Sequence, residues 1–301
     1  MTMTRVGFIG LGNMGSPMAA HLADAGFAMT ISDAAPGVTE GFAAEHPTSV
    51  AAAGAQSFAG VEALILMLPT SEIVEDVLEG GKVADALPPG CLVIDMSSSE
   101  PLRTRRLAAR LHARGLSMLD APVSGGVRGA RAASLSVLVG GSEDDLTRAT
   151  PVLNAMAAKI IRVGDIGSGH AAKALNNLVS AATISVTVEA LVLAESFGIS
   201  ADTMTKVLNS SSGRSNTSEN KVAQFMTSGR FDSGFSLQLM AKDVGLAIGL
   251  ARALDRPVEV AGHVADQWRR IAGEVSPATD HTQMYRLLGA TRDGSQADVA
   301  P

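Results

Sequence analysis

The sequence predicts an α/β domain with a doubly wound, mainly parallel sheet, followed by an all-α domain. The first half alternates short apolar runs, such as RVGFI, ALILML and CLVID, with segments of helical spacing. Apolar runs bounded by Gly, Pro or Asp are typical of buried parallel strands, and their alternation with helices indicates a doubly wound sheet. After residue 169 nothing resembles a strand strongly, and only long helical patterns follow.

The expected elements follow in chain order. Strands are expected over RVGFI, AMTISD, ALILML, CLVID, SML and SLSVLV. Helices are expected from about residue 14, over 38–45, 73–78 and 101–113, and from 143. Further helices are expected over 170–197, 201–209, 217–227, 237–253 and 258–273. The first of these would be roughly 40 Å long, which suits a helix between two domains. The glycine-rich segment 164–169 therefore marks the boundary, giving domains of residues 1–164 and 165–295 and a polar tail of residues 296–301.

Composition excludes several classes of protein. With 301 residues, 46% hydrophobic and 18% charged, the chain is globular, and a net charge of −6 argues against a nucleic-acid partner. The one cysteine, Cys91, is expected to be a buried apolar residue in a reducing compartment. The N-terminus lacks a signal-peptide layout, and the apolar segment 178–194 contains Glu189 and is shorter than the about 20 residues of a bilayer span. We therefore expect a cytoplasmic protein without a membrane partner.

A glycine-rich loop between the first strand and the first helix predicts a dinucleotide site. The loop consists of Gly10, Leu11, Gly12, Asn13, Met14 and Gly15. In this context the three glycines allow a tight turn, backbone approach to a pyrophosphate, and close packing of helix on strand. The helix N-terminus favours the phosphates. An ordinary glycine turn is the weaker alternative, so we expect a Rossmann-type domain.

The choice of cofactor depends on Asp33, which ends the second strand 18 residues after Gly15. A carboxylate there accepts hydrogen bonds from the ribose hydroxyls of NAD and repels a 2′-phosphate. No arginine follows in AAP, so NAD is expected rather than NADP; an aspartate that only caps a turn is the alternative. Leu68, Pro69 and Ser98 lie at the carboxyl ends of later strands, where ligands bind in such sheets, and are expected as further cofactor contacts.

Lys173 is the candidate for the chemistry. It is one of only six lysines and lies in the apolar first turns of the long helix, where dipole and desolvation are expected to lower the ammonium pKa. A positioned lysine can take the proton of an alcohol during hydride transfer to NAD. Asn177, at i+4, shares its helix face and could hold the amine or the substrate. A solvated lysine and a competing base, His170, are the alternatives.

The segment DAPVSGG predicts a binding site for a carboxylate. Ser124 and the N–H groups of Gly125 and Gly126 form a small anion nest, although a simple tight turn explains the same residues. No His, Cys, Asp or Glu set has metal-ligand spacing, so no metal is expected.

Taken together, four motifs resemble the β-hydroxyacid dehydrogenase family, typified by 3-hydroxyisobutyrate dehydrogenase and tartronate semialdehyde reductase. They are FIGLGNMGSPMA, DAPVSGG, GDIGSGHAAKALNN and MAKDVGLA, in order along nearly the whole chain. The resemblance implies that Lys173 is the general acid/base, that Asn177 and Ser124–Gly126 bind the substrate, and that Lys242 reaches the cofactor. It also implies a Rossmann-type domain, a helical domain, and a homodimer or homotetramer. Ser98 stands where the family often has Thr.

The resemblance thus predicts an NAD-dependent oxidoreductase that reversibly oxidises a small β-hydroxy acid. The 3-hydroxyisobutyrate enzymes usually carry an aromatic residue after the Ser-Ser-Gly segment, whereas this chain has Arg214. We hypothesise that Arg214 meets a second anionic or hydroxylated end of a more polar substrate; an exposed loop arginine is the alternative. A non-catalytic nucleotide-binding relative and an imine-reducing member are alternative functions, but such relatives typically lack the lysine.

Overall fold

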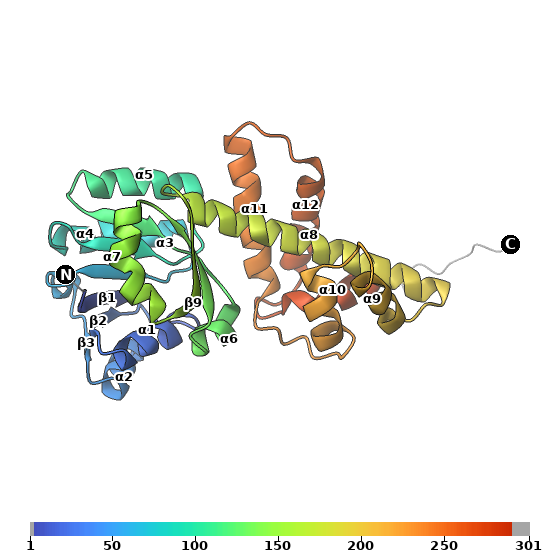
Figure 1. The fold of residues 1–301 in the computed structure, drawn as a ribbon, viewed down its shortest axis with the longest axis horizontal. Coiled ribbons are helices and arrows are strands. Elements are labelled where there is room, and N and C mark those ends of the chain that lie inside the picture. The colour runs from blue at the N-terminus through green and yellow to red at the C-terminus, as the bar shows by residue number, and fades with distance from the viewer. Residues whose placement is uncertain (1–2, 291–301) are drawn as a thin grey trace. The chain divides into compact units, whose positions relative to one another are not determined.

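The structure is a computed structural model that describes residues 3–290, and it divides into two compact units (Figure 1). The first unit ends at Lys173 and the second begins at Ala174. The first unit is α/β and the second is helical, so the predicted fold class is confirmed. The expected tail, residues 296–301, lies outside the described residues.

A nine-stranded sheet forms the centre of the first unit. The strands are β1 Arg5–Ile9, β2 Ala28–Ser32, β3 Ser49–Ala51, β4 Ala63–Leu66, β5 Leu92–Asp95, β6 Ser117–Asp120, β7 Val123–Ser124, β8 Leu135–Gly140 and β9 Ala157–Gly164. Their order is β3-β2-β1-β4-β5-β6-β8-β7, with β9 beside β8. Strands β1 to β6 are parallel, whereas β8 runs antiparallel to β6 and β7. The connections lead from β1 to β2 and β3 on one side, and the strands from β4 onward lie on the other side of β1. Such sheets bind ligands at this topological switch point.

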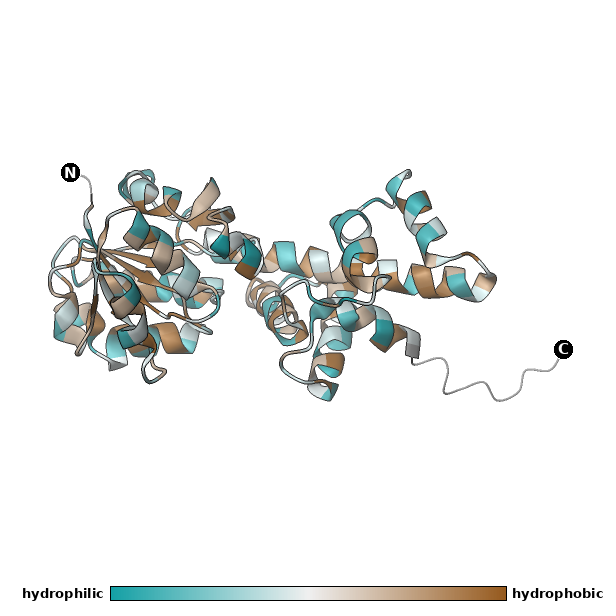
Figure 2. Ribbon diagram, turned by 90° about the horizontal axis from the view of Figure 1, so that it is seen from below, coloured by the Kyte–Doolittle hydropathy of each residue, from teal (hydrophilic) through white to brown (hydrophobic). Residues whose placement is uncertain are grey.

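Helices cover both faces of this sheet (Figure 1). They are α1 Gly15–Asp24, α2 Val38–Glu45, η1 Ala55–Phe58, α3 Ser71–Glu75, η2 Asp76–Gly80, α4 Val83–Ala86, α5 Pro101–His112, α6 Gly126–Arg131 and α7 Glu143–Asn154. Side chains of α1, α2, α6 and α7 share one apolar core with the sheet, and those of α3, η2, α4 and α5 share the other. The strands between these cores are mainly apolar, and every residue of β4 is a buried apolar one (Figure 2). Cys91 is buried in the second core, as predicted.

The helices that follow surround the core of the second unit. They are α8 Ser168–Phe197, α9 Ala201–Asn209, α10 Asn216–Asn220, η3 Val222–Met226, α11 Leu237–Ala253, α12 Glu259–Glu274, η4 His281–Gln283 and α13 Met284–Ala290. Trp268 is fully buried there, and its Nε1 donates to Ser185 Oγ at 3.0 Å. The single helix expected over 217–227 is instead two pieces, because Lys221 (φ −115°) interrupts α10 before the π-helical turn η3.

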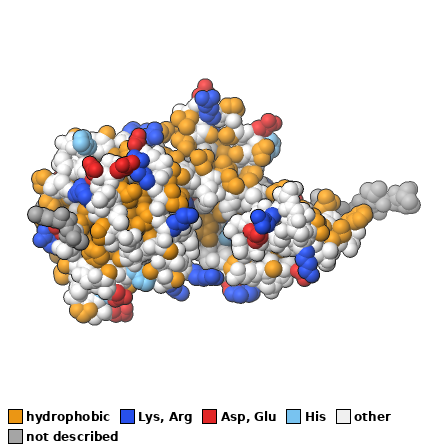
Figure 3. Space-filling view, in the orientation of Figure 1, with side chains coloured by type: hydrophobic (Ala, Val, Ile, Leu, Met, Phe, Trp, Pro, Cys, Tyr) orange, Lys and Arg blue, Asp and Glu red, His pale blue; other side chains and the backbone are white. Residues whose placement is uncertain are grey.

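Helix α8 is apolar on two opposite faces. One face packs into the core through residues such as Ala181, Ile184 and Val188. The other face carries an exposed apolar stripe, which consists of Leu175, Val179, Val186, Leu193 and Phe197. These five side chains are 47% to 84% exposed and lie within about 40° of one another on a helix of 100° per residue. Figure 3 shows hydrophobic side chains gathered at the C-terminal end of α8.

The length of α8 also bears on the membrane question. Within residues 3–290, α8 is the one helix long and apolar enough to cross a membrane, by length and composition only. Of its most apolar window, 44% is buried inside the protein. A core helix of a soluble protein meets the same criterion, so this is weak evidence for a span.

Candidate active site

The glycine loop follows β1, as the sequence predicts, and two of its glycines are required by close packing. Gly10 has a φ of +102°, and a Cβ there would overlap the carbonyl oxygen of Met67. A Cβ at Gly15 would overlap the carbonyl oxygen of Gly10. At Gly12, by contrast, a Cβ would meet no described atom within 4 Å. The fold itself therefore leaves room beside Gly12, and this room suits the close approach of a pyrophosphate to the backbone.

Asp33 holds the same loop from the end of β2. Its Oδ2 accepts a hydrogen bond from the N–H of Leu11 at 2.6 Å, and its Oδ1 accepts one from Ala35 N at 2.8 Å. The carboxylate thus caps the turn after β2 and fastens the glycine loop. A carboxylate has about four acceptor sites, so these two bonds leave capacity for a ribose hydroxyl.

The loops after β4 and β5 are joined by a buried serine. Ser97 Oγ accepts from Leu68 N at 2.9 Å, while Ser97 N donates to Asp95 Oδ1 at 3.0 Å. Ser97 is 1% exposed, so its hydroxyl supports the loop rather than facing solvent. Pro69 and Ser98 follow directly on these two loops, at the same edge of the sheet as the glycine loop.

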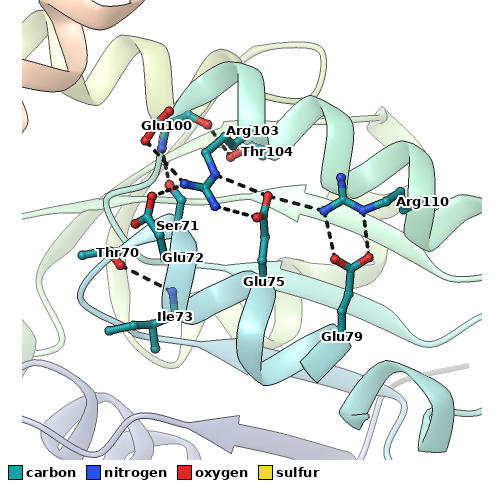
Figure 4. Close-up of polar contacts among 10 residues, drawn as sticks. All are labelled: Thr70, Ser71, Glu72, Ile73, Glu75, Glu79, Glu100, Arg103, Thr104 and Arg110. Carbon is teal, nitrogen blue, oxygen red and sulfur yellow. Dashed lines mark hydrogen bonds and ion pairs between the residues drawn. The ribbon is translucent and has the colours of Figure 1, made fainter. Parts of the chain in front are cut away.

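Ion pairs join helices α3 and α5, which follow the loops after β4 and β5 (Figure 4). Arg103 of α5 pairs with Glu72 and Glu75 of α3, and its Nη2 lies 2.6 Å from Glu75 Oε2. The hydrogen bond from Arg103 is the main reason why the pKa of Glu75 is lowered. Ser71 Oγ accepts from Glu100 N at 2.7 Å. The cofactor edge of the sheet is therefore a pre-organised set of loops.

Lys173 lies in the second turn of α8, with 8% of its surface exposed. His170, the competing base, has a side chain with no exposed surface. Its Nδ1 lies 2.9 Å from Thr104 Oγ1, and this hydroxyl donates to Glu100 O at 3.1 Å, so the Thr104 oxygen accepts from His170. A base must reach the substrate. The burial of His170 therefore favours Lys173 as the group that exchanges the proton.

Asn177 is held by an aspartate that the sequence analysis did not single out. Its Nδ2 donates to Asp243 Oδ2 at 2.6 Å, and its Oδ1 accepts from Asn176 at 3.2 Å. Asp243 is 2% exposed, and its Oδ1 lies 3.6 Å from Lys242 Nζ. The motif MAKDVGLA thus brings Asp243 into contact with Asn177. The Lys-Asp pair in this motif was the sequence signal that could have identified Asp243.

The nest residues form the turn between β7 and α6. Ser124 pairs with Ser136 of β8, and the following Gly125 and Gly126 have φ values of +130° and +60°. These values lie in the left-handed region that favours glycine. The segment is therefore a tight strand-to-helix turn, and its glycine N–H groups and serine hydroxyl are donors of the kind that a carboxylate needs.

Arg214 lies just before α10, on the surface of the second unit. Its side chain is 62% exposed, and Nη1 lies 3.6 Å from Glu219 Oε1. Among the residues from 3 to 290, no group of three or more His, Cys, Asp or Glu could hold a metal ion.

A doubly wound sheet with a glycine loop after β1, followed by a helical unit entered through a lysine-bearing helix, defines a nicotinamide-dependent dehydrogenase of the two-domain type. Residues 5–164 match the model described as the NAD binding domain of 6-phosphogluconate dehydrogenase. Residues 167–288 match the model described as NAD-binding of NADP-dependent 3-hydroxyisobutyrate dehydrogenase.

Individual relatives cover nearly the whole chain. A probable 3-hydroxyisobutyrate dehydrogenase of Mycobacterium tuberculosis (strain ATCC 25618 / H37Rv) is 39% identical over 97% of this chain and 100% of its own. A 2-(hydroxymethyl)glutarate dehydrogenase of Eubacterium barkeri is 39% identical over 81% of each chain. A solved structure of the Mycobacterium tuberculosis 3-hydroxyisobutyrate dehydrogenase with L-serine is similar with a TM-score of 0.89, at 37% identity over 95% of this chain and 99% of that one.

The chain belongs to the β-hydroxyacid dehydrogenase family, which confirms the resemblance inferred from its motifs. It is an NAD-dependent oxidoreductase of β-hydroxy acids, and the comparisons do not favour the non-catalytic or imine-reducing alternatives.

Proposed function

We propose that Lys173 is the general acid/base in the reversible oxidation of a small, polar β-hydroxy acid. In the oxidative direction the hydroxyl proton of the substrate passes to the Lys173 amine. The electron pair of the carbon–hydrogen bond leaves as hydride, and the carbon–oxygen bond becomes a carbonyl. NAD supplies the hydride acceptor. In the reverse direction the Lys173 ammonium polarises the carbonyl and returns the proton.

The observation that carries this proposal is the position of Lys173 on α8. The residue is 8% exposed, near a helix N-terminus, and three residues beyond a histidine whose side chain is wholly buried against Thr104. A lysine can give up its proton, unlike an arginine. The same helix carries Asn177, which we propose as a substrate-binding residue.

We propose that Ser124, Gly125 and Gly126 bind the substrate carboxylate. The positive φ values of both glycines, +130° and +60°, shape the backbone at this turn as in other anion-binding nests. The Ser124 hydroxyl adds a side-chain donor. A carboxylate fixed here would leave the hydroxyl-bearing carbon as the reacting end.

Arg214 and two relatives support a substrate with a polar second end. One relative is named for 2-(hydroxymethyl)glutarate, a dicarboxylate, and the similar structure of the Mycobacterium tuberculosis enzyme is one with L-serine. Arg214 is exposed and paired with a single carboxylate at 3.6 Å, so it can exchange Glu219 for an anionic end of a substrate. We therefore propose a hydroxy acid whose second end is anionic or hydroxylated.

A panel of three acids tests the function and the role of Arg214 together. Turnover of 3-hydroxyisobutyrate, L-serine and 2-(hydroxymethyl)glutarate with NAD is followed by nicotinamide absorbance. Arg214→Ala is expected to lower kcat/KM for the dicarboxylate about tenfold relative to L-serine, the loss of one charged hydrogen bond. Arg230→Ala, at another exposed ion-paired arginine, is the matched control. Equal ratios in both variants would exclude Arg214, and no turnover of any acid would contradict the substrate class.

We propose that Asp33 selects NAD over NADP. Further cofactor contacts are proposed at Leu68, Pro69, Ser98 and Lys242. Because the Asp33 carboxylate repels a 2′-phosphate, Asp33→Asn is expected to raise the ratio of NADP to NAD activity about tenfold. Asparagine keeps one side-chain oxygen for the N–H of Leu11, whose bond to the native carboxylate is 2.6 Å. An unchanged ratio would assign the selection to another residue.

We also propose a homodimer or homotetramer in the cytoplasm. The support is the exposed apolar stripe of α8, since an apolar helix face rimmed by polar residues marks protein–protein contact sites. Light scattering after gel filtration tests this proposal with Val186→Glu/Leu193→Glu, and Val260→Glu on α12 is the control. A native monomer, or an oligomer that survives the double change, would contradict an interface at this stripe.

A further inference from the structure

Asp120, the last residue of β6, is a buried carboxylate at the start of α8. It has no exposed surface. Its Oδ1 accepts a hydrogen bond from Gly167 N at 2.6 Å, and its Oδ2 accepts one from His170 N at 2.7 Å. The two oxygens therefore bind the backbone N–H of the residue just before α8 and an N–H in its first turn, where the helix dipole is positive. Bonds from a carboxylate to N–H groups are about twice as strong as neutral ones.

The first turn of α8 also packs closely against the sheet. A Cβ at Gly169 would overlap Leu138 O, and it would lie 2.8 Å from Asp120 O and 2.9 Å from Asp120 Oδ2. A Cβ at Gly140 would overlap Asp120 Oδ1 and lie 2.8 Å from Gly169 N. Real Cβ atoms essentially never lie so close. The first turn of α8 is therefore closely packed against Asp120 and β8, and both glycines are required for this approach.

A second contact holds the same turn from α5. The ring of His170 is bonded to Thr104 Oγ1 at 2.9 Å and has no exposed surface. The backbone N–H of His170 is bonded to Asp120 at 2.7 Å, so one residue is fixed at both its backbone and its side chain. Lys173 follows three residues later on the same helix, about 5 Å further along its axis. The position of the Lys173 backbone therefore depends on the contacts that hold residues 167 and 170.

Asp120 is at the same time the first residue of DAPVSGG and stands four residues before Ser124. One carboxylate therefore joins the strand that leads to the proposed substrate carboxylate site with the helix that carries the proposed acid/base. We propose that Asp120 is a positioning residue that fixes Lys173 relative to the turn at Ser124. This inference rests on the proposed function, in which Lys173 exchanges the proton of the substrate.

Asp120→Asn tests the inference with a minimal change of shape. The asparagine side chain has one oxygen, so it can accept from only one of the two backbone N–H groups and presents its own NH₂ to the other. Misplacing an acid/base by about 1 Å costs up to about a hundredfold in rate. We expect kcat to fall ten- to a hundredfold, with KM for NAD unchanged. The panel acid of highest activity, deuterated at the hydroxyl-bearing carbon, should show a larger isotope effect on kcat than in the native enzyme.

Two controls separate positioning from general destabilisation. Ser142→Ala removes the side-chain cap of α7 in the same unit, a bond of 3.1 Å to Asp145 N, and should leave kcat and the isotope effect unchanged. Hydrogen exchange of the amides of residues 167–173 should accelerate in Asp120→Asn and stay native in Ser142→Ala. If Asp120→Asn does not fold, Thr104→Val loosens the same turn through His170 and should lower kcat several-fold.

Lys173→Met distinguishes failure of this inference from failure of the proposed function. If Lys173→Met retains turnover, the acid/base assignment fails. If Lys173→Met is inactive but folded Asp120→Asn keeps kcat within threefold of native, or loses it without a larger isotope effect, the positioning role fails. When Thr104→Val is the only folded variant, a native kcat in that variant likewise overturns the role.

Discussion

Two lysines lie in largely buried surroundings, one in each unit, and their neighbourhoods differ. Lys173 follows a turn of α8 whose backbone is bonded to Asp120 at 2.6 and 2.7 Å. Lys221 lies at the break between α10 and η3, and its Nζ donates to Ser180 Oγ at 3.1 Å. Burial lowers the pKa of Lys221 to about 8, although the nearby Asp280 charge opposes this shift. A displaced lysine pKa is therefore not by itself a mark of catalysis in this chain.

The difference lies in what each lysine is attached to. The contacts described around Lys173 are made by Asp120 and His170, and they hold the start of its helix. Lys221 uses its own amine to join the segment after α10 to α8. Its charge also acts on His281, whose Nδ1 donates to Phe235 O at 2.9 Å. Burial first, and then the Lys221 charge, lowers the pKa of His281 to about 4. The contacts around Lys173 position the start of α8, whereas the contacts of Lys221 join the segment after α10 to α8.

The sharpest test of this comparison replaces each lysine by methionine, which keeps the length of the side chain. We expect Lys173→Met to lower kcat about a thousandfold or more, because the proton transfer loses its acid/base. Lys221→Met should keep kcat within about threefold. NADH binding, measured by fluorescence, should be native in both variants. A large loss of kcat in folded Lys221→Met would contradict the division of roles between the two regions.

The region around Lys221 and His281 should instead control how the stability of the protein depends on acid pH. His281 has a folded pKa of about 4 against a usual 6.5, so the folded protein binds this proton less well than the unfolded chain. The unfolding free energy should therefore fall by about 3 kcal/mol as the pH drops from 6.5 through 4. His281→Gln should show a flatter dependence in urea titrations over this range. The exposed His263→Gln is the control, and equal slopes in all three proteins would contradict the assignment.

A smaller effect is expected at alkaline pH. The folded pKa of Lys221, about 8, lies below the usual 10.5, so the folded protein releases this proton first and gains stability as the pH rises through this window. Between pH 7.5 and 9.5 the native protein should gain about 2 kcal/mol relative to Lys221→Met. Urea unfolding of the two proteins at both pH values measures this difference. A difference that stays constant would show that Lys221 titrates normally in the folded protein.

Much of the fold could be predicted because its signals are local. Apolar runs marked the long strands of the parallel part of the sheet, and the helix expected over 170–197 is observed as Ser168–Phe197. Short elements such as β3, β7 and α6 were not predicted, because two to six residues give too little periodicity. The break at Lys221 was also missed, and the side chain at this break is hydrogen-bonded to Ser180, 41 residues away in the sequence.

The sequence by itself determined the fold class, the glycine loop and the family, because each depends on residues close together in the chain or on motifs that can be read in order. Only the tertiary structure decided what holds the site. Asp120 meets the N–H groups of Gly167 and His170 across 47 and 50 residues, and Asp33 meets Leu11 across 22. Such hydrogen bonds form only when folding brings a carboxylate and a distant stretch of backbone together. They therefore cannot be predicted from the spacing of residues in the sequence. The lysine could be found in the sequence, but the carboxylate that anchors its helix could not.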